Sequence, residues 1–433
     1  MNNIAAIVLA AGRGTRMKSD IPKVLHNIFG KPIISYVLES LKAAGITHVI
    51  TVAGYGSGAL SKAIDTKIVI QKKLLGSGDA VASAKKLLGG HRGQIIVTCG
   101  DMPLMSARTI KKLILKQRSS GASLTLATAT VKDPAEYGRI VRNASGAVSK
   151  IVESADIKDA ADEINEVNTG TYCFRAKDLF EALKRVKPNP RTGEYLLTDT
   201  VEILDKAGKK IKSVEVEDPL EMTGINSRRD LAEATLILKD KAINEAMLSG
   251  VTVEDPLTTT IYPDARIGRD TVIHPNTFIG PRVEIGRDCH IGPFARLTSS
   301  VKVGSNVIIG NFVELVRTTI GDDCRVKHHT YLGDAVLGRK VNIGAGTITA
   351  NYDGKNKNKT IIRENAFIGV GSVLIAPLVI GKNATVGAGC VVLKRHNVPE
   401  GETVVGVPAK ILERRLGKVR RGSDEKRSVD IQR

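Results

Sequence analysis

Two hydrophobic patterns divide the chain. Over residues 1–227, short apolar, β-branched runs alternate with longer stretches that have helical spacing. The short runs predict strands at Ile4–Ala11, His48–Val52, Lys67–Ile70, Gln94–Thr98 and Leu124–Thr130. The longer stretches predict helices at Pro32–Ala44, Gly78–Leu88 and Ser106–Arg118. This alternation predicts an α/β domain whose mostly parallel sheet is covered by helices and binds ligands beyond the carboxyl ends of its strands.

From about residue 251 an apolar residue recurs every six positions. The repeat slips by one residue after Leu315 and again after Leu332, and a polar, cationic segment, Asn351–Lys359, interrupts it. The repeated positions are Ile267, Ile273, Ile279, Ile285, Ile291, Leu297, Val303, Ile309, Leu315, Ile320, Val326, Leu332, Leu337, Ile343, Thr349, Ile362, Ile368, Leu374, Ile380, Val386 and Val392. Such a hexapeptide repeat predicts a left-handed parallel β-helix with three short strands per turn. The interrupting segment is either a functional loop or a tolerated surface insertion.

The stretch between the two patterns, Arg228–Ser249, contains neither Gly nor Pro. Apolar residues recur in it near helical spacing, at Leu231, Ala234, Leu238, Ala242, Ala246 and Leu248. It therefore predicts a long helix that joins two domains. The predicted organisation is a first domain at 1–227, a linker helix at 228–250, a β-helix domain at 251–408 and a basic tail at 409–433.

Composition narrows the class of protein. The 433 residues include 3% aromatic residues and no Trp, and the formal net charge is +19. Because base-stacking aromatics are few, anionic small-molecule substrates and a basic tail explain this charge better than a nucleic-acid partner does. The tail, Lys410–Arg433, carries nine Lys or Arg against four Asp or Glu. We expect it to be a solvated or frayed end.

Cysteine usage and hydropathy indicate the compartment. Five cysteines are scattered along the chain, and none forms a Cys-x-x-Cys pair. This pattern predicts reduced thiols in a cytoplasmic protein. The apolar run at the N-terminus is too short for a signal peptide and lacks a basic flank. No stretch approaches the roughly 18 apolar residues of a membrane span.

The first candidate site is the loop that follows the first predicted strand. It contains Leu9, Ala10, Ala11 and Gly12 and continues through Gly14, with cations at Arg13, Arg16 and Lys23. Glycine backbone and fixed cations suit a polyphosphate. The alternative is a simple glycine turn with solvated cations. The loop is neither a P-loop, because no Gly-Lys-Ser/Thr follows, nor a dinucleotide fingerprint, because the third glycine is missing.

Asp101 is the first candidate metal ligand. It follows Cys99 and Gly100 directly after a buried strand, where a carboxylate is either a metal or ribose ligand or a helix cap. The intervening Met102-Pro103 makes it a poor cap for the helix predicted at Ser106, which favours a metal role.

Several motifs carry a resemblance to one known family. They are Leu-Ala-Ala-Gly-x-Gly-Thr-Arg-Met at 9–17, Pro-Lys-Val-Leu-His at 22–26, Tyr-Gly-Arg-Ile at 137–140, Asn-Thr-Gly at 168–170, Asn-Phe-Val-Glu at 311–314, His-His-Thr-Tyr-Leu-Gly-Asp from His328, and Asn-Ile-Gly-Ala-Gly-Thr-Ile-Thr-Ala-Asn-Tyr-Asp-Gly at 342–354. Residues 4 to about 408 resemble the bacterial bifunctional UDP-N-acetylglucosamine pyrophosphorylases that are also glucosamine-1-phosphate N-acetyltransferases. The first motif marks sugar nucleotidyltransferases in general, and the last is specific to this family.

For the first domain, a Rossmann-like nucleotidyltransferase domain, the resemblance implies transfer of UMP from UTP to N-acetylglucosamine 1-phosphate. It assigns Leu9, Ala10, Ala11, Gly12, Lys23, Gln71, Gly76 and Ser77 to the uridine nucleotide, and Gly138, Glu153, Asn168 and Asn226 to the UDP-sugar. It implies Mg²⁺ at Asp101 and Asn226. Arg16 and Lys23 would neutralise charge while the sugar phosphate attacks the α-phosphorus, and no protein nucleophile is required.

For the β-helix, the resemblance implies acetyl transfer from acetyl-CoA and a homotrimer. His328, which as a lone residue would more often be structural, would in this motif be the general base on the sugar amine. The acceptor sugar phosphate is assigned to Tyr331, Asn342 and Lys357, and acetyl-CoA to Ala345, Asn351, Tyr352 and Ala388.

The β-helix half also departs from the family pattern. Thr298 and Val316 stand where family members usually have cations that hold the sugar phosphate, Gly406 where an Arg often meets coenzyme A, and Val370 where a serine is usual. Because Thr298 and Val316 are 18 residues apart, which is one turn of the predicted β-helix, we expect them to stack on one face. Three hypotheses therefore stay open. They are a bifunctional enzyme, a uridylyltransferase whose β-helix serves for trimerisation or acts on another acceptor, and a non-catalytic regulatory subunit.

Overall fold

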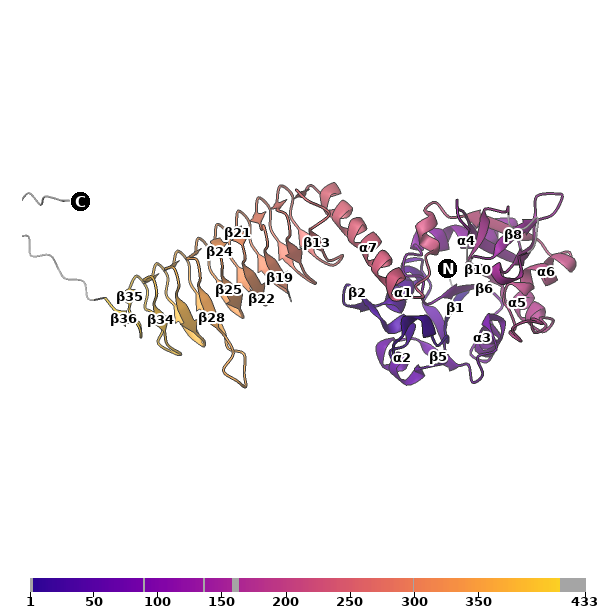
Figure 1. The fold of residues 1–433 in the computed structure, drawn as a ribbon, viewed down its shortest axis with the longest axis horizontal. Coiled ribbons are helices and arrows are strands. Elements are labelled where there is room, and N and C mark those ends of the chain that lie inside the picture. The colour runs from indigo at the N-terminus through magenta and orange to yellow at the C-terminus, as the bar shows by residue number, and fades with distance from the viewer. Residues whose placement is uncertain (1–2, 89, 135–136, 158–162, 299, 413–433) are drawn as a thin grey trace, which may run out of the picture. The chain divides into compact units, whose positions relative to one another are not determined.

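A computed structural model describes residues 3–88, 90–134, 137–157, 163–298 and 300–412. The chain divides into two compact units, Met1–Leu238 and Lys239–Arg433 (Figure 1). Most of the predicted basic tail, residues 413–433, lies outside the described residues. Among the described helices, none is long and apolar enough to cross a membrane.

The first unit is built on a mixed β-sheet. Its main strands, in spatial order, are β11 (Ile211–Glu215), β7 (Leu124–Thr130), β10 (Glu166–Arg175), β6 (Gln94–Cys99), β1 (Ile4–Ala10), β4 (His48–Ala53) and β5 (Lys67–Ile70). The pairs β1–β4, β1–β6, β4–β5 and β7–β11 are parallel, whereas β10 is antiparallel to β6 and β7. The hairpin of β8 (Arg139–Arg142) and β9 (Val148–Val152) extends the sheet beside β10. The predicted strands and the mostly parallel sheet are confirmed.

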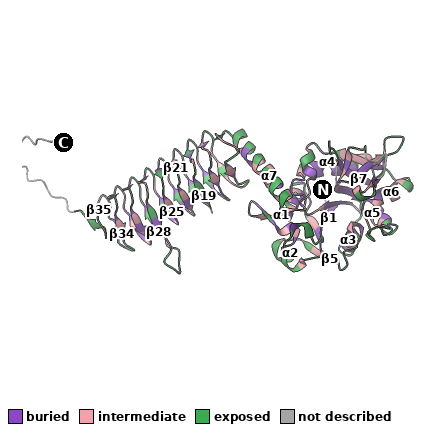
Figure 2. Cartoon of the chain, in the orientation of Figure 1, coloured by how far each residue is buried: buried purple, intermediate pink, exposed green. Residues whose placement is uncertain are grey.

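Helices cover both faces of this sheet. They are α1 (Ile33–Ala43), α2 (Ser57–Ala63), α3 (Ser77–Ser83), α4 (Ala107–Ser120), α5 (Ala176–Leu183) and α6 (Asp199–Lys206). Helices α3, α5 and α6 pack on the face that buries Ala5 and Ile7, and α1, α2 and α4 pack on the face that buries Ala6 and Val8. The central strands are buried on both sides (Figure 2), which is why their sequences read as continuous apolar runs.

The second unit is a parallel β-helix in which each of the three faces is formed by one sheet. The first contains β12 (Thr252–Val253), β15 (Val272–Ile273), β18 (His290–Ile291), β21 (Ile308–Asn311), β24 (Arg325–His328), β27 (Asn342–Ile343), β30 (Phe367–Ile368), β33 (Thr385–Val386), β35 (Thr403–Val405) and β36 (Lys410–Ile411). The second contains β13 (Thr260–Ile261), β16 (Phe278–Ile279), β19 (Arg296–Thr298), β22 (Glu314–Val316), β25 (Tyr331–Gly333), β28 (Ile348–Ala350), β31 (Val373–Ile375) and β34 (Val391–Val392). The third contains β14 (Arg266–Ile267), β17 (Glu284–Ile285), β20 (Lys302–Val303), β23 (Thr319–Ile320), β26 (Ala335–Leu337), β29 (Thr360–Ile362) and β32 (Leu378–Ile380).

The corners of the β-helix explain its six-residue period. A residue with positive φ follows the inward apolar residue by three positions at Asp270, Asn276 and Asp288, and at most other corners. After Leu315 the positive-φ residue is Arg317, only two positions on, and after Leu332 it is Asp334. The two slips in the repeat are therefore corners shortened by one residue. The repeated apolar residues fill the core, with Ile267 partly buried at one end.

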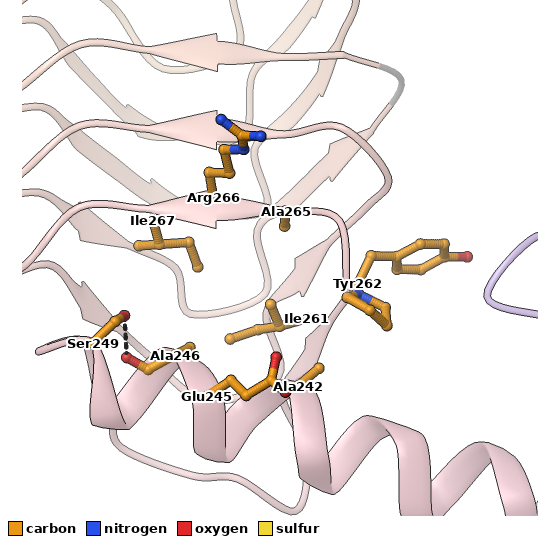
Figure 3. A pocket seen from close by; sticks show the side chains of 10 residues that line it. Ala242, Glu245, Ala246, Ser249, Ile261, Tyr262, Ala265, Arg266 and Ile267 are labelled. Carbon is orange, nitrogen blue, oxygen red and sulfur yellow. Dashed lines mark hydrogen bonds between the residues drawn. The ribbon is translucent and has the colours of Figure 1, made fainter. Parts of the chain in front are cut away.

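Helix α7 (Arg228–Leu248) contributes to both units. In the first unit, Ala234 is buried with Met17 and Ile28. In the second unit, Ala242, Ile243 and Ala246 belong to the part of the helix that covers the first coils of the β-helix, next to a cavity of about 270 Å³ (Figure 3). The predicted helix is confirmed, but the prediction that Leu248 belongs to its apolar face is wrong. Leu248 is 89% exposed because it lies two residues beyond Ala246, off the buried face, where the helix ends.

The segment Asn351–Lys359 leaves the β-helix between β28 and β29 as a short two-strand loop. An antiparallel bridge joins Tyr352 and Lys357, and the Asn358 amide donates to the Asn351 carbonyl at 2.7 Å. The loop extends from the solenoid near β28 (Figure 1).

Candidate active sites

A cavity of about 290 Å³ lies at the carboxyl ends of the parallel strands β1, β5 and β6. The residues that line it are Leu9, Ala10, Ala11, Gly12, Lys23, Val24, Gln71, Leu74, Gly76, Ser77, Ala80, Cys99, Asp101 and Glu194. The structure thus brings together the eight residues that the sequence assigned to the uridine nucleotide. Asp101, the first candidate metal ligand, lies in the same wall.

The glycines around this cavity have different reasons to be glycine. Gly14 has a φ of +63°, and a Cβ there would lie 2.7 Å from the Lys23 Cβ. Gly76 has a φ of +99°, and its Cβ would lie 2.6 Å from the Tyr195 carbonyl oxygen. Gly12 has open space around its Cβ position and lines the cavity. Backbone conformation therefore requires glycine at positions 14 and 76, while Gly12 leaves room for a ligand.

Lys23 connects the two predicted metal ligands. Its ammonium forms an ion pair with Asp101 Oδ2 and donates to Asn226 Oδ1 at 2.9 Å. The backbone holds the two segments together, because the Ile225 amide donates to the Asp101 carbonyl at 2.9 Å. Asp101 does not cap a helix, since Ser106 caps α4 by accepting from the Thr109 amide.

These two oxygens fit a magnesium ion. A carboxylate and an amide oxygen that both contact one ammonium point at one position, and hard oxygen ligands are what Mg²⁺ prefers. Among the described residues, no group of three or more His, Cys, Asp or Glu side chains could hold a metal. Substrate phosphates and water would therefore have to complete the coordination, as is common for Mg²⁺.

Asp230 fixes the segment that carries Asn226. Its Oδ2 accepts from the backbone amides of Asn226 and Ser227 at 2.8 and 2.9 Å. Burial opposes ionisation of Asp230, but these hydrogen bonds, with one from the Ser227 hydroxyl and the charge of Arg16, hold its pKa below the usual value. Asp230 is therefore a carboxylate that orders the start of α7. Arg16 does not line the cavity, and its charge contributes to the lowered pKa of Asp230.

Cys99 is not a nucleophile in this cavity. Burial, with the neighbouring charge of Asp101, raises the pKa of its thiol to about 12. The thiol therefore stays protonated near neutral pH, where only a thiolate would attack.

Three of the residues predicted to hold the UDP-sugar, Gly138, Glu153 and Asn168, lie together, whereas Asn226 lies with Lys23 and Asp101. The Asn168 amide donates to the Gly138 carbonyl, and the Asn168 side chain donates to the Tyr172 hydroxyl, both at 2.8 Å. A Cβ at Gly138 would lie 3.6 Å from Glu153 Oε2. Burial and Glu153 raise the pKa of Tyr172, so its hydroxyl stays neutral. The Thr198 hydroxyl donates to Glu153 Oε1 at 2.6 Å.

The second candidate site lies on the β-helix around the exposed His328. His328, at the end of β24, is paired in register with Asn311 of β21. The His328 Nδ1 lies 2.8 Å from Asn311 Oδ1. With the amide oxygen as acceptor, Nδ1 carries the hydrogen and the Nε2 lone pair is left available to accept a proton.

Tyr331, Asn351 and Asp334 meet on the adjoining sheet. A Cβ at Gly333 would lie 2.5 Å from the Tyr331 hydroxyl and 2.7 Å from Asn351 Nδ2, so any larger residue there would displace these two side chains. Asn351 Nδ2 donates to Asp334 Oδ2 at 2.5 Å. Arg317 donates to both Asp334 oxygens at 2.7 Å. These Arg317 hydrogen bonds are the main reason why the pKa of Asp334 lies below its usual value, and the Asn351 hydrogen bond and the charge of Lys357 lower it further.

Thr298 and Val316 form one column with Gly333. Thr298 pairs with Val316, and Val316 pairs with Gly333, on three successive turns. The predicted stacking of the two neutral residues on one face is therefore confirmed. Thr298 is buried, and its hydroxyl lies 3.5 Å from the Leu315 carbonyl oxygen.

The residues assigned to acetyl-CoA occupy successive turns beyond His328. The Gly346 amide donates to the His329 carbonyl, the Gly371 amide to the Ala345 carbonyl, and the Gly389 amide to the Val370 carbonyl. Ala345, Val370 and Ala388 therefore follow one another along one corner. Val370 is 58% exposed in the middle of this column.

The remaining predicted residues lie around the same end of the β-helix. Asn342 pairs with Arg325 in the strand next to β24. Tyr352 is 61% exposed, and its hydroxyl donates to the Gly354 carbonyl at 2.7 Å. Gly406 has a φ of +93°, where an arginine would be strained.

Five residues of these sites were given no role by the sequence analysis. Ser227 and Asp230 form a capping box, a signal that was readable from their spacing. Asn311 lies one shortened turn before His328, and the slip in the repeat could have revealed it. Glu194 and Thr198 gave no sequence signal, because a distant loop brings them to the site.

Comparisons with known proteins match each half of the chain to a known family. Residues 6–200 match the MobA-like NTP transferase domain. Residues 264–299, 282–317 and 359–394 match the bacterial transferase hexapeptide family of six repeats. The bifunctional protein GlmU of Pelotomaculum thermopropionicum is 43% identical over 411 residues, which cover 87% of this chain and 90% of the relative. The chain belongs to the GlmU family. Proteins of the same name from Halalkalibacterium halodurans and Acetivibrio thermocellus are each 41% identical, over 90% and 92% of this chain and 93% and 94% of their own lengths.

Proposed function

We propose that this GlmU family member carries out two reactions. The first transfers UMP from UTP to N-acetylglucosamine 1-phosphate, giving UDP-N-acetylglucosamine and pyrophosphate, and belongs to residues 1–227. The second acetylates glucosamine 1-phosphate from acetyl-CoA and belongs to residues 251–408. Residues 228–250 link the two, and the five unpaired cysteines are consistent with a cytoplasmic protein.

The cavity at the carboxyl ends of β1, β5 and β6 is the observation that carries the first reaction. Leu9 to Gly12, Gln71, Gly76 and Ser77 would surround the uridine nucleotide, and Gly138, Glu153 and Asn168 the acetamido sugar. Asp101 and Asn226 would hold Mg²⁺, which neutralises phosphate charge when bound. Lys23 and Arg16 add positive charge, so that two polyanions can meet in line.

The pair of His328 and Asn311 carries the second reaction. Asn311 holds the imidazole so that its Nε2 is free to take a proton from the sugar amine as that amine attacks the thioester. Tyr331, Asn342 and Lys357 would contact the acceptor, and Ala345, Asn351, Tyr352 and Ala388 the acetyl-CoA. The family resemblance implies a homotrimer, in which a neighbouring copy would cover His328 and Tyr352, both exposed on one chain.

Two assays test the proposal separately. Pyrophosphate release from UTP and N-acetylglucosamine 1-phosphate with Mg²⁺ measures the first reaction. Thiol release from acetyl-CoA and glucosamine 1-phosphate measures the second. If either product is absent at high substrate concentration, the corresponding reaction is contradicted. For the oligomer, a sedimentation mass near the 46.3 kDa of one chain at micromolar concentration contradicts the trimer.

The column of Thr298, Val316 and Gly333 favours a second candidate. It offers no cation to an acceptor phosphate, and the nearby Arg317 is paired with Asp334. The β-helix would then act on another amine or serve as the trimerisation scaffold. Thiol release that is absent with glucosamine 1-phosphate but present with unphosphorylated amino sugars would indicate another acceptor, and no release with any amino sugar would indicate a scaffold.

A further inference from the structure

The ammonium of Lys23 occupies the point at which the two proposed metal ligands converge. It contacts Asp101 Oδ2 and, at 2.9 Å, Asn226 Oδ1. The side chains of Lys23 and Asp101 are only 15% and 18% exposed, so little water screens this contact. A divalent ion that uses both oxygens needs the same point, because Mg²⁺–oxygen distances are about 2.1 Å. Two cations cannot share it, since like charges at that separation repel strongly.

We propose that Lys23 is an exchangeable cation, which fills the metal position in the nucleotide-free protein and leaves it when nucleotide and metal bind together. The inference rests on the proposed uridylyltransferase site. It explains why metal would bind to that site only together with nucleotide.

The structure gives Lys23 a fixed base and a movable head. Its Cβ is packed against Gly14, where even one added carbon would come within 2.7 Å. Beyond Cβ, the flexible stem leads to a compact ammonium that can turn between partners. Lys23 also lines the cavity with Gly12 and Gln71, so a bound polyphosphate would be within the same space as its head group.

The nucleotide supplies both halves of the exchange. Its phosphates offer the ammonium a new anionic partner and offer the metal further oxygen ligands. Without nucleotide, a metal ion would have to displace the ammonium from Asp101 and leave it with no such partner. Metal binding to the nucleotide-free protein should therefore be weak, and removal of the Lys23 charge should strengthen it.

Binding of Mn²⁺ to the nucleotide-free full-length protein, followed by electron paramagnetic resonance, tests this exchange. Lys23→Met should raise Mn²⁺ affinity by about tenfold or more, the usual effect of removing a like charge at contact distance. Lys23→Arg keeps a competing cation and should bind Mn²⁺ as weakly as the wild type. Lys18→Met is the matched control, because it removes the same charge from an exposed position in the same loop, and it should change nothing. Equal affinities for wild type, Lys23→Met and Lys18→Met overturn the exchange.

The Asp101→Ala variant separates this inference from the proposed function. In the presence of UTP, the wild type should bind Mn²⁺ at least tenfold more tightly than the Asp101→Ala variant, because the variant lacks one of the proposed protein ligands of the ion. If the two bind equally, the metal assignment itself is wrong and the exchange falls with it. If Asp101→Ala weakens binding but Lys23→Met has no effect without nucleotide, only the exchange is wrong.

A measurement on unsubstituted protein covers the case in which Lys23→Met does not fold. Lysines dimethylated with carbon-13 keep their charge, and Lys23 is assigned by its absence in Lys23→Arg. Saturating Mg²⁺ and UTP should move the Lys23 resonance, because its ammonium changes partners. An unmoved Lys23 resonance in that complex overturns the exchange.

Discussion

The two candidate sites are built in opposite ways. The nucleotide cavity gathers loops from residues 9–24, 71–80, 99–101 and 194, which are remote in sequence and meet at one edge of a sheet. The His328 site takes residues from neighbouring turns of one repeat, 17 or 18 positions apart, and leaves His328 exposed although Thr298 and Asn351 are buried. An α/β edge can enclose a ligand within one chain, whereas a solenoid corner presents a flat row of side chains that needs a second surface to enclose anything.

The sites also differ in how they handle charge. In the first unit, Lys23, Asp101 and Asn226 converge on one point that a polyphosphate and its metal would use. In the β-helix, Arg317 and Asp334 neutralise each other beside the neutral column of Thr298 and Val316. The first site therefore holds a cation where a highly charged ligand would bind, whereas the Thr298–Val316 column of the second offers none to an acceptor phosphate.

The largest expected effect is on the first reaction alone. Asp101→Ala should lower the rate of pyrophosphate release by about 10³-fold or more, because a metal ligand worth several kcal/mol of charge stabilisation is lost. Thiol release from acetyl-CoA should not change, which is the internal control for folding. Pyrophosphate release at the wild-type rate would falsify the metal assignment.

The mirror-image experiment removes the proposed general base. His328→Ala should lower thiol release by about 10²- to 10⁴-fold and leave pyrophosphate release intact. A loss of both activities would show that the substitution acts on folding or assembly. Unchanged thiol release would show that another group takes the proton.

Restoring charge to the neutral column tests why the second site differs from the first. Thr298→Arg with Val316→Lys should lower the KM for glucosamine 1-phosphate by about 10²- to 10⁴-fold, since a hydrogen bond to a charged group contributes roughly 1.5–3 kcal/mol. The kcat should stay within a few-fold, because His328 is untouched. An unchanged KM would mean that another cation already holds the phosphate. Arg317→Gln and Lys327→Gln, the latter at the exposed lysine next to His328, would then identify it.

The Asn311–His328 contact should matter less than the histidine itself. Asn311→Ala should lower kcat for thiol release about tenfold, the cost of one neutral hydrogen bond, and should shift the pH profile of kcat. The KM for acetyl-CoA should stay the same, because Asn311 acts through the imidazole. A normal kcat with a normal pH profile would show that His328 needs no such positioning.

The smallest effect concerns the two glycines of the first loop. Gly14→Ala places a Cβ at positive φ against Lys23 and should lower the free energy of unfolding by about 1–2 kcal/mol. This lowers the Tm of the unit that contains Gly14 by about 2–8 °C. Gly12→Ala is the matched control, since its Cβ meets nothing within 4 Å. Its Tm should be unchanged. Equal Tm values for both variants would contradict the conformational role of Gly14.

The sequence by itself determined the architecture of both halves. Local periodicity was enough, because strand and helix spacing and the six-residue repeat record which side chains face inward. In the β-helix it even predicted the contact between Thr298 and Val316, since one turn has a nearly constant length. It also identified α7, apart from Leu248, whose exposure depends on where the helix ends.

Only the tertiary structure decided how the first site is assembled. Nothing local in the sequence brings Glu194 to the loop at Gly12, or Asn226 to Asp101, because those meetings depend on which strand edges and loops the whole sheet places together. The same holds for Lys23. Its ammonium could be counted as positive charge from the sequence, but its position between two proposed metal ligands follows from three remote segments packed at one edge. Contacts at regular sequence spacing are encoded by that spacing, and contacts made by long-range packing are not.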